Sequence, residues 1–444
     1  MKGTMSWNYT PYCQFDRHSK CNDPHIVRLA STRNGFDIEW IANLNCDSYH
    51  LCVKEREGAW QQEYALTEKQ FSITGLKENT DYEVYIASES GVKSKFRLVR
   101  TGFTPGVMIN YLHPEDQTYA FSGQYLCSPS VVRLPNGKLI VSMDVFNRDK
   151  PQNHTILFQS EDGGNSWDYL TEIHPCFWGK LFMHKGELYL LGISGQYGDV
   201  LIGKSLDEGK TWTKPVTLFY GSCLAGEGFH RAPCVITSHD GRLWTSIEYG
   251  SWKINGFCNC VLSADESHDL MDVENWIIST PYRQEAKSPA IEGNVVVSPE
   301  GEVINFLRYK YEEALLLKAD TKDPDRSCIL YKKIKFPMGN TKFEIKKHKN
   351  GRYYAIGNDD VYERSKLSIY SSLDLENWQY EVAVVDYSYA DRYKVGFQYP
   401  SFIFEEDGFL VISRTAFNHA TNFHDNNCIT CHKVQFDFSV HGCE

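Results

Sequence analysis

Short apolar runs separated by turn residues recur along most of the chain. After residue 107 six phrases of one form follow one another: an apolar run, a short turn containing glycine, and a second apolar run. They cover residues 130–141, 181–190, 235–244, 295–304, 343–354 and 402–411. Alternation of apolar and polar residues is typical of strands, and a glycine turn joins two strands in a hairpin. Six hairpins at intervals of about 55 residues, with almost no helical periodicity, predict an all-β six-bladed β-propeller.

A separate alternating region precedes these hairpins. Its runs of strand-like residues, at 25–29, 35–40, 48–54, 70–73, 81–86 and 95–99, predict a β-sandwich with Trp40 as its buried core indole. The predicted division is therefore a tail or strap over 1–23, a sandwich over 24–103 and a propeller over 104–444. Closing a propeller ring usually needs a strand from the far end of the domain, and residues 429–434 or the segment just after residue 106 could supply it.

One turn pattern is repeated: serine, any residue, aspartate, any residue, glycine, any residue, serine or threonine, then tryptophan. It covers residues 160–167 and 205–212, and a less well kept copy covers 371–378. The aspartate accepts hydrogen bonds from its own turn, and glycine takes backbone angles closed to other residues. The tryptophan buries a large apolar face beside the incoming strand. The first two copies start 45 residues apart, which is the spacing of a propeller blade.

This pattern is the Asp box, and the chain resembles the sialidase-like (neuraminidase-like) propeller superfamily that carries it. The resemblance implies a propeller architecture and is silent on chemistry, because Asp boxes lie on the outer rim. Residues 74–85 in turn resemble the fibronectin type III signature, with Tyr82 as its tyrosine-corner residue. Such domains are mostly spacers or docking surfaces, and some bind carbohydrate.

Charge and composition limit the classes of partner that the protein is expected to bind. A net charge of −11 argues against a nucleic acid, although a local arginine cluster could still hold a small acidic ligand. No apolar run approaches 18 residues, so no membrane span is expected, and the first residues lack the apolar core of a secretory signal, which favours the cytoplasm.

Of the fourteen cysteines only Cys428 and Cys431 form a C-x-x-C pair. His424 and His432 flank that pair, but without a second pair of ligands we expect buried free thiols and neither metal nor cofactor.

Propeller geometry nominates the site residues. The innermost strand of each blade starts at the mouth of the central channel, so residues just before each hairpin, and just after its second strand, converge on one pocket. Of the residues that meet this rule, those nominated for catalysis or substrate binding are Asp149, His230, Arg231, Glu248, Glu292, Asn294, Arg308, Asn340, Lys342, Arg364, Gln398, Tyr399 and Arg414. Polar residues on a concave face with no core to fill suggest a sugar site.

The sialidase resemblance implies roles for some of them. That family pairs a tyrosine nucleophile with a glutamate that takes its proton, uses an aspartate as acid/base, and clamps the substrate carboxylate with three arginines. Tyr399 matches the nucleophile, Glu292 its partner and Asp149 the acid/base, while Arg308 and Arg364 match the second and third arginines. A tyrosine whose proton is accepted by a carboxylate gains nucleophilicity without repelling an anionic sugar.

Two features depart from the family pattern. Where the first arginine stands in an Arg-Ile-Pro motif, this chain reads Cys127-Ser128-Pro129, so one arm of the clamp is missing. Arg231 and Arg414 are the candidates to replace it. The sequence also adds His230, a possible acid or base that ordinary sialidases lack.

The sequence therefore predicts an exo-acting glycoside hydrolase, sialidase-like with an altered clamp, that removes a terminal acidic sugar from an oligosaccharide or glycoconjugate. Two alternatives remain open at this point. One is a polysaccharide lyase acting on a uronate-containing glycan through His230 and Tyr399, and the other is a non-catalytic glycan-binding propeller. The sequence does not determine the oligomeric state.

Overall fold

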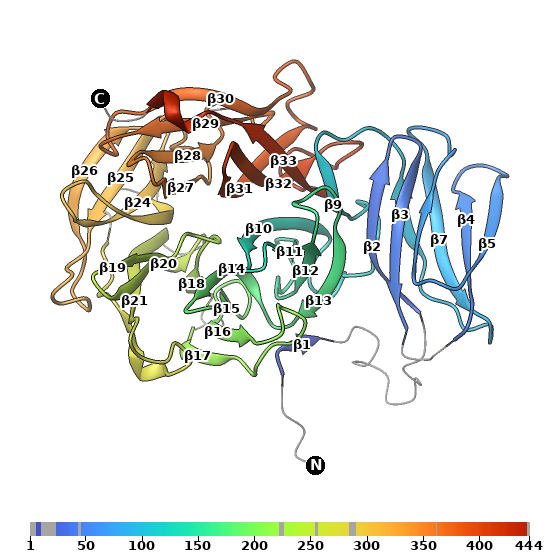
Figure 1. Cartoon of the computed structure of the whole chain (residues 1–444), viewed down its shortest axis with the longest axis horizontal. Coiled ribbons are helices and arrows are strands. Elements are labelled where there is room, and N and C mark those ends of the chain that lie inside the picture. The colour runs from blue at the N-terminus through green and yellow to red at the C-terminus, as the bar shows by residue number, and fades with distance from the viewer. Residues whose placement is uncertain are drawn as a thin grey trace, which may run out of the picture.

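The computed structural model describes residues 6–9, 24–42, 46–221, 226–253, 256–283, 290–360 and 362–441. These residues form eight β-sheets and two short 3-10 turns, η2 (Val273–Asn275) and η3 (Phe438–His441). Six of the sheets surround a central channel, and two stand beside the ring (Figure 1).

The two sheets beside the ring pack against each other. One contains β2 (His25–Thr32), β3 (Gly35–Ile41) and β6 (Gln70–Ile73); the other contains β5 (Gln61–Leu66), β4 (Tyr49–Glu55), β7 (Asp81–Ser88) and β8 (Arg97–Arg100). Trp40 is buried between them as predicted, edge-on to Tyr49 with ring centroids 5.6 Å apart. The Tyr82 hydroxyl accepts a hydrogen bond of 3.1 Å from the Lys77 amide, the contact expected of a tyrosine corner.

The prediction of a six-bladed propeller is confirmed, with one antiparallel sheet per blade. The first blade contains β10 (Tyr125–Arg133), β11 (Leu139–Phe146), β12 (Thr155–Ser160) and β13 (Asp168–Ile173), and the second contains β14 (Phe177–His184), β15 (Glu187–Ile193), β16 (Val200–Ser205) and β17 (Val216–Phe219). The third contains β18 (Gly228–His230) and β19 (Thr237–His239), which both pair with β20 (Arg242–Ser251), followed by β21 (Gly256–Asp265) and β22 (Trp276–Ile278), and the fourth contains β23 (Ile291–Val297), β24 (Val303–Lys310), β25 (Glu313–Lys318) and β26 (Ile329–Lys335). The fifth contains β27 (Glu344–Lys347), β28 (Tyr353–Gly357), β29 (Lys366–Ser372) and β30 (Gln379–Asp386), and the sixth contains β31 (Gly396–Glu405), β32 (Gly408–Ala416) and β33 (Cys428–Gln435).

Strand β9 (Val107–Tyr111) closes the ring by pairing antiparallel with β33, with Tyr111 opposite Cys428. The two segments predicted as alternatives are therefore partners. A second N-terminal segment also binds the ring, because β1 (Asn8–Tyr9) pairs with β13. Beside it the buried Trp7 indole donates a hydrogen bond of 2.8 Å to the Pro175 carbonyl and packs edge-on against Trp212. Residues 6–9 thus form a strap across the first two blades.

The Asp boxes fasten three of the hairpins. In the second box the Asp207 carboxylate accepts hydrogen bonds from the Thr211 amide (2.8 Å) and hydroxyl (2.6 Å), and the Trp212 indole donates to the Gly209 carbonyl (2.9 Å). The third box begins at Ser372, one residue later than the predicted stretch, and contains no glycine. Leu375 occupies the left-handed conformation there (φ 65°), where Gly164 and Gly209 stand at φ 90° in the other two boxes.

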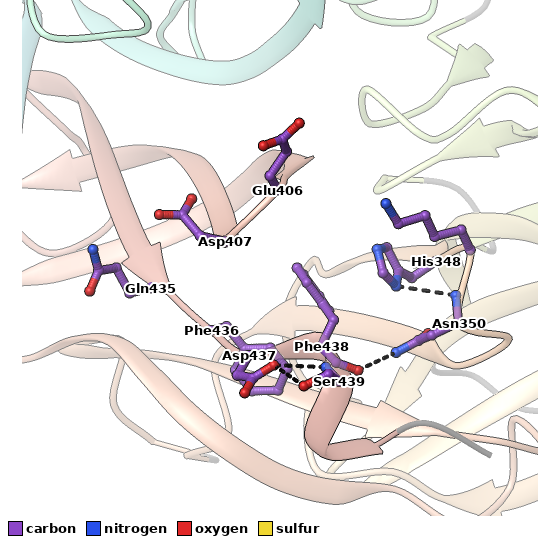
Figure 2. Close-up of a pocket in the computed structure, with 10 residues that line it drawn as sticks. His348, Asn350, Glu406, Asp407, Gln435, Phe436, Asp437, Phe438 and Ser439 are labelled. Atoms are coloured by element: carbon purple, nitrogen blue, oxygen red, sulfur yellow. Dashed lines mark hydrogen bonds between the residues drawn. The ribbon is translucent and has the colours of Figure 1, made fainter.

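The end of the described chain folds back over the last two blades. The Phe438 ring stacks on His348 with centroids 4.1 Å apart, and the side-chain amide of Asn350 donates a hydrogen bond of 3.4 Å to the Phe438 carbonyl (Figure 2). The hollow beside this contact has a volume of about 660 Å³. None of the nominated site residues lines it.

Candidate active site

Four innermost strands share one local irregularity. Strands β10, β14, β23 and β31 each contain a β-bulge near their beginning, and each bulge holds a residue at positive φ: Ser128 (49°), Trp178 (50°), Glu292 (54°) and Tyr399 (52°). A left-handed conformation is strained for a residue with a Cβ, and bulges re-aim a side chain that would otherwise follow the strand's alternation. Here Trp178, Glu292 and Tyr399 are turned into a common cavity.

This cavity has a volume of about 580 Å³ at one mouth of the channel. The structure brings seven of the nominated residues together in its wall: Asp149, His230, Glu292, Arg308, Arg364, Tyr399 and Arg414. They come from five of the six blades, so only the closed ring assembles them.

Tyr399 and Glu292 form a hydrogen-bonded pair. The Tyr399 hydroxyl donates to Oε1 of Glu292 at 2.7 Å, and Nη1 of Arg308 donates to Oε2 of the same carboxylate at 2.6 Å. Burial and the Glu292 charge raise the pKa of Tyr399 to about 12, against the opposing effect of the nearby arginines. Burial opposes the charge on Glu292, but Arg308 and the other groups around the carboxylate, including the Tyr399 hydroxyl, together outweigh it and hold the pKa of that carboxyl below its usual range. At neutral pH the tyrosine is therefore protonated and the glutamate is ionised.

Two further arginines surround the tyrosine. The Arg414 guanidinium lies 5.1 Å from the centroid of the Tyr399 ring, donates to the Asn426 side chain and binds the His424 carbonyl. The Arg364 guanidinium donates to Gln398, and burial lowers its pKa to about 10, so it is still charged at neutral pH. With Arg308 they make a ring of three cations around one phenol, a strong environment for an anion.

Cys127, at the position of the family's first arginine, is fully buried, and burial raises the pKa of its thiol to about 12. It supplies no charge to the cavity. Arg231 is also fully buried and does not line the cavity, since its guanidinium donates to the Leu191 carbonyl at 3.0 Å and to the Ala232 carbonyl at 3.3 Å. The structure thus places Arg414, and not Arg231, beside Tyr399.

His230 lines the cavity on the side of Trp178. Its Nδ1 lies 3.1 Å from Oε2 of the buried Glu248, and its ring lies edge-on to the Trp178 indole with centroids 4.3 Å apart. If Nδ1 donates to the carboxylate, Nε2 is left as an acceptor. Glu248 itself does not line the cavity, so it positions His230.

Asp149 lies in the loop between β11 and β12, where its side chain is exposed in the cavity wall. Its amide donates 3.1 Å to the Asn147 side chain, which shapes the loop as an Asx turn. A carboxylate at the open side of the cavity can exchange protons with a departing sugar oxygen or with water.

Four other nominated residues lie beneath the cavity or outside its wall. Asn294 joins two blades by donating to the Phe343 carbonyl and accepting from the Ile345 amide, each at 3.1 Å. Lys342 donates 2.5 Å to the Pro400 carbonyl, Gln398 supports Arg364, and Asn340 is half-buried ahead of β27. We assign these residues no direct contact with a ligand.

The structure adds wall residues that the sequence reasoning did not nominate. They are Phe146, Arg148, Gln152, Tyr197, Trp252 and Lys253. Trp252 is 53% exposed beside His230, and its amide donates 3.2 Å to the Tyr197 hydroxyl. Trp252 directly follows β20, the second strand of its hairpin. The geometric rule, which takes the residues just after each second strand, would have nominated Trp252 if it had been applied a few residues further along the chain.

Within the described ranges no three or more His, Cys, Asp or Glu side chains are grouped to hold a metal ion. Cys428 and Cys431 are both buried in β33. No helix of the described part of the chain is long and apolar enough to cross a membrane.

Several solved structures of enzymes that act on glycosides have a similar fold. They include the Hadza microbial sialidase Hz136 (13% identity, covering 92% of this chain and 95% of the other, TM-score 0.52). They also include a leech intramolecular trans-sialidase (10% identity, 94% and 92%, TM-score 0.52) and an α-L-arabinanase of Penicillium chrysogenum (15% identity, 74% and 97%, TM-score 0.51). At such identities the likeness shows the fold alone. No curated protein sequence matches the chain.

A family model gives the closer assignment. The model described as BNR repeat-like domain matches residues 181–412, which is just over half of the chain and runs from the second blade to the sixth. The match agrees with the repeated Asp boxes and with the six antiparallel blades. The chain belongs to the BNR repeat-like domain family.

Proposed function

We propose that the protein is an exo-acting glycoside hydrolase that removes a terminal acidic sugar from a glycan. The observation that carries the proposal is the 2.7 Å hydrogen bond from the Tyr399 hydroxyl to Glu292 inside a cavity ringed by Arg308, Arg364 and Arg414. Propellers of this fold include a sialidase and an arabinanase, which supports glycosidase chemistry by analogy.

In the first step the Tyr399 oxygen attacks the anomeric carbon while its proton passes to Glu292. The bond from that carbon to the departing sugar oxygen breaks, and Asp149 gives the oxygen a proton. Because the pKa of Tyr399 is raised to about 12, the phenol keeps its proton until attack begins, and the ionised Glu292 is ready to accept it.

In the second step water attacks the same carbon from the open side. Its proton passes to Asp149, the bond to Tyr399 breaks, and Glu292 returns the proton to the phenolate oxygen. Two displacements at one carbon retain the anomeric configuration.

The charge of the cavity favours an acidic sugar. Its wall holds the basic residues Arg148, Lys253, Arg308, Arg364 and Arg414 against the carboxylates of Asp149 and Glu292. Glu292 is already paired with Arg308, which leaves Arg364 and Arg414 free of carboxylate partners among the described residues. We assign Arg414 the clamp role that Cys127 cannot perform.

The test is incubation with glycans that end in acidic or neutral sugars, with released sugars measured by chromatography. Tyr399→Phe should lower turnover at least about 10³-fold. Tyr362→Phe, an exposed tyrosine outside the cavity wall, is the matched control and should leave turnover unchanged. Arg414→Met should raise KM for acidic sugars about 10- to 100-fold and leave KM for neutral ones unchanged. Full activity in Tyr399→Phe would contradict the mechanism.

A lyase is the second candidate, because His230, which contacts the buried Glu248, lines the same cavity as Tyr399. A uronate neutralised by the arginines would lose its acidic C–H proton to His230, and Tyr399 would protonate the leaving oxygen. Such a reaction gives an unsaturated uronate that absorbs in the ultraviolet and is lost in His230→Ala. If neither hydrolysis nor absorbance appears with any glycan, a non-catalytic binding role replaces both.

A further inference from the structure

The central channel has a second mouth. Strands β14, β23 and β31 supply Trp178, Glu292 and Tyr399 to the active-site cavity near their beginnings. With their later residues the same strands line another cavity, of about 630 Å³, on the opposite face of the ring. Its wall is mostly apolar, but it carries the cations Arg133, Lys180, Lys346 and Lys347, and none of the described residues that line it is a carboxylate.

Between the two mouths lies a buried cluster of one carboxylate and three ammonium groups. Nζ of Lys180 contacts Oε1 of Glu344 at 2.5 Å, and Nζ of Lys346 lies 3.8 Å from the same oxygen. The side chains of Lys180 and Glu344 are 5% and 0% exposed. The third ammonium group, that of Lys342, donates to the Pro400 carbonyl and is 1% exposed.

The positive charge of the three ammonium groups exceeds the negative charge of the single carboxylate in the cluster. Glu344 is shared by Lys180 and Lys346, and it also accepts a hydrogen bond of 2.8 Å from the Phe402 amide. Each ammonium group has three donors, and the described residues give Lys342 a single hydrogen-bond acceptor. The ammonium group of Lys346 also donates to the Phe402 carbonyl, and burial lowers its pKa to about 8, the direction expected of a cation removed from water. Buried charges are normally paired, so an anion would stabilise this arrangement.

Arg133 forms an ion pair with Glu405, so the other cations of the cavity wall are the groups available to bind an anion. Lys346 is 24% exposed at the side chain and reaches both the cluster and the cavity, while Lys347 is exposed at its edge. We infer that the far mouth of the channel is a binding site for an anionic group, a sulfate, phosphate or carboxylate, held by Lys180, Lys346 and Lys347. The apolar wall around these cations would suit the body of an organic molecule that carries the group.

The first experiment locates the anion. Crystals of the full chain soaked in sodium bromide should give an anomalous peak in contact with the ammonium groups of Lys346 and Lys180. A peak confined to the arginines of the active-site cavity, or no peak in the channel, would overturn the inference. Because position is the readout, the result does not depend on the proposed enzymatic activity.

The second experiment measures affinity. Calorimetric titration with inorganic sulfate at constant ionic strength should show binding that Lys346→Met weakens about 10-fold. Lys347→Met, at an exposed position that tolerates substitution, should weaken it several-fold even if Lys346→Met fails to fold. Lys349→Met removes the same charge two residues further along and outside this cavity, and should have no effect. Equal affinity in Lys347→Met and Lys349→Met would contradict the site.

The source of the anion is resolved by a competition. If a sulfated disaccharide displaces sulfate at a concentration ten-fold lower than inorganic sulfate does, the site takes an organic anion. If the two compete equally, a free inorganic ion is sufficient. Measuring both in Arg364→Met, in which the active-site cavity has lost a cation, separates this binding from that of the catalytic mouth.

Discussion

Asp144 supports the active-site wall from behind. Its carboxylate accepts hydrogen bonds from the Trp178 amide at 2.8 Å and from the Thr155 hydroxyl at 2.5 Å, and so fixes the bulge that turns the indole into the cavity. The side chain is fully buried, and this burial raises its pKa from 3.8 to about 8. A buried acid that prefers to be neutral makes the stability of the site depend on pH.

The sign of this dependence follows from the raised pKa. The contribution of Asp144 is fully present below pH 3.8 and is lost as the pH rises through about 8, because the folded state then has to carry a buried charge. Asp144→Asn keeps an acceptor for Trp178 and removes the titration. Its free energy of unfolding should therefore rise relative to wild type from pH 4 to pH 8, by at most about 1.4 kcal/mol per pH unit. Urea denaturation at several pH values measures this, and a difference constant with pH would contradict it.

Sequence reasoning found residues of the cavity wall more readily than the residues that support them. Tyr399, Glu292, Arg308 and Arg364 stand at motif positions near strand ends, which the chain order alone identifies. It could not tell that Asn294, two residues after Glu292, faces the next blade. A bulge shifts the alternation of a strand by one residue, and nothing in the one-letter sequence marks the bulge.

At the scale of elements, the Asp boxes act as local fasteners of the outer strands. Their loops join the third and fourth strands of a blade, at the end of the sheet away from the active-site cavity. The first two boxes could be predicted because serine, aspartate, glycine and tryptophan keep their spacing. The third box begins one residue later than predicted, and Leu375 takes the place of the glycine there. Burial of the Leu375 side chain in the core between two blades offsets the strain of its left-handed backbone.

Asp207→Ala should lower the free energy of unfolding by about 2 kcal/mol, because it removes an ionised acceptor of several turn hydrogen bonds. Glycan turnover per folded molecule should be unchanged, since the box is remote from the cavity. Thermal melting and an activity assay together test the prediction. The matched control is Asp240→Ala, in an exposed hairpin turn of the next blade, which should cost far less. Loss of turnover without loss of stability in Asp207→Ala would show that the box affects the active site and does not only stabilise its hairpin.

At the scale of the whole molecule, the sandwich is joined to the ring by a buried ion pair. Arg97 of β8 and Asp116 of the loop after β9 lie 2.6 Å apart with side chains 2% and 1% exposed, and Arg97 also donates 2.8 Å to the Ile26 carbonyl. Arg28 adds a hydrogen bond of 2.9 Å to the Ile109 carbonyl of β9. The alternating pattern predicted every strand of the two sandwich sheets except β5, but it predicted no contact with the ring, because such contacts join residues from two regions with independent patterns.

Asp116→Asn should leave Arg97 buried without a counter-ion and lower the free energy of unfolding by about 3–5 kcal/mol. Arg33→Met breaks an exposed ion pair with Glu78 in the same sandwich and should cost less than about 1 kcal/mol. Denaturation followed by tryptophan fluorescence compares the two variants. Equal effects would mean that the buried pair is not what couples the sandwich to the propeller.

The pairing of β9 with β33 has a consequence for biosynthesis. The sandwich strands and β9 leave the ribosome first, whereas β33 follows every other blade strand in the chain. A nascent chain can complete its sandwich early but must hold β9 without its partner until the last blade has emerged, and an unpaired strand edge invites pairing with other chains. The buried contacts of Arg28 with β9 and of Arg97 with the loop after it would hold the strand against the finished sandwich during the wait.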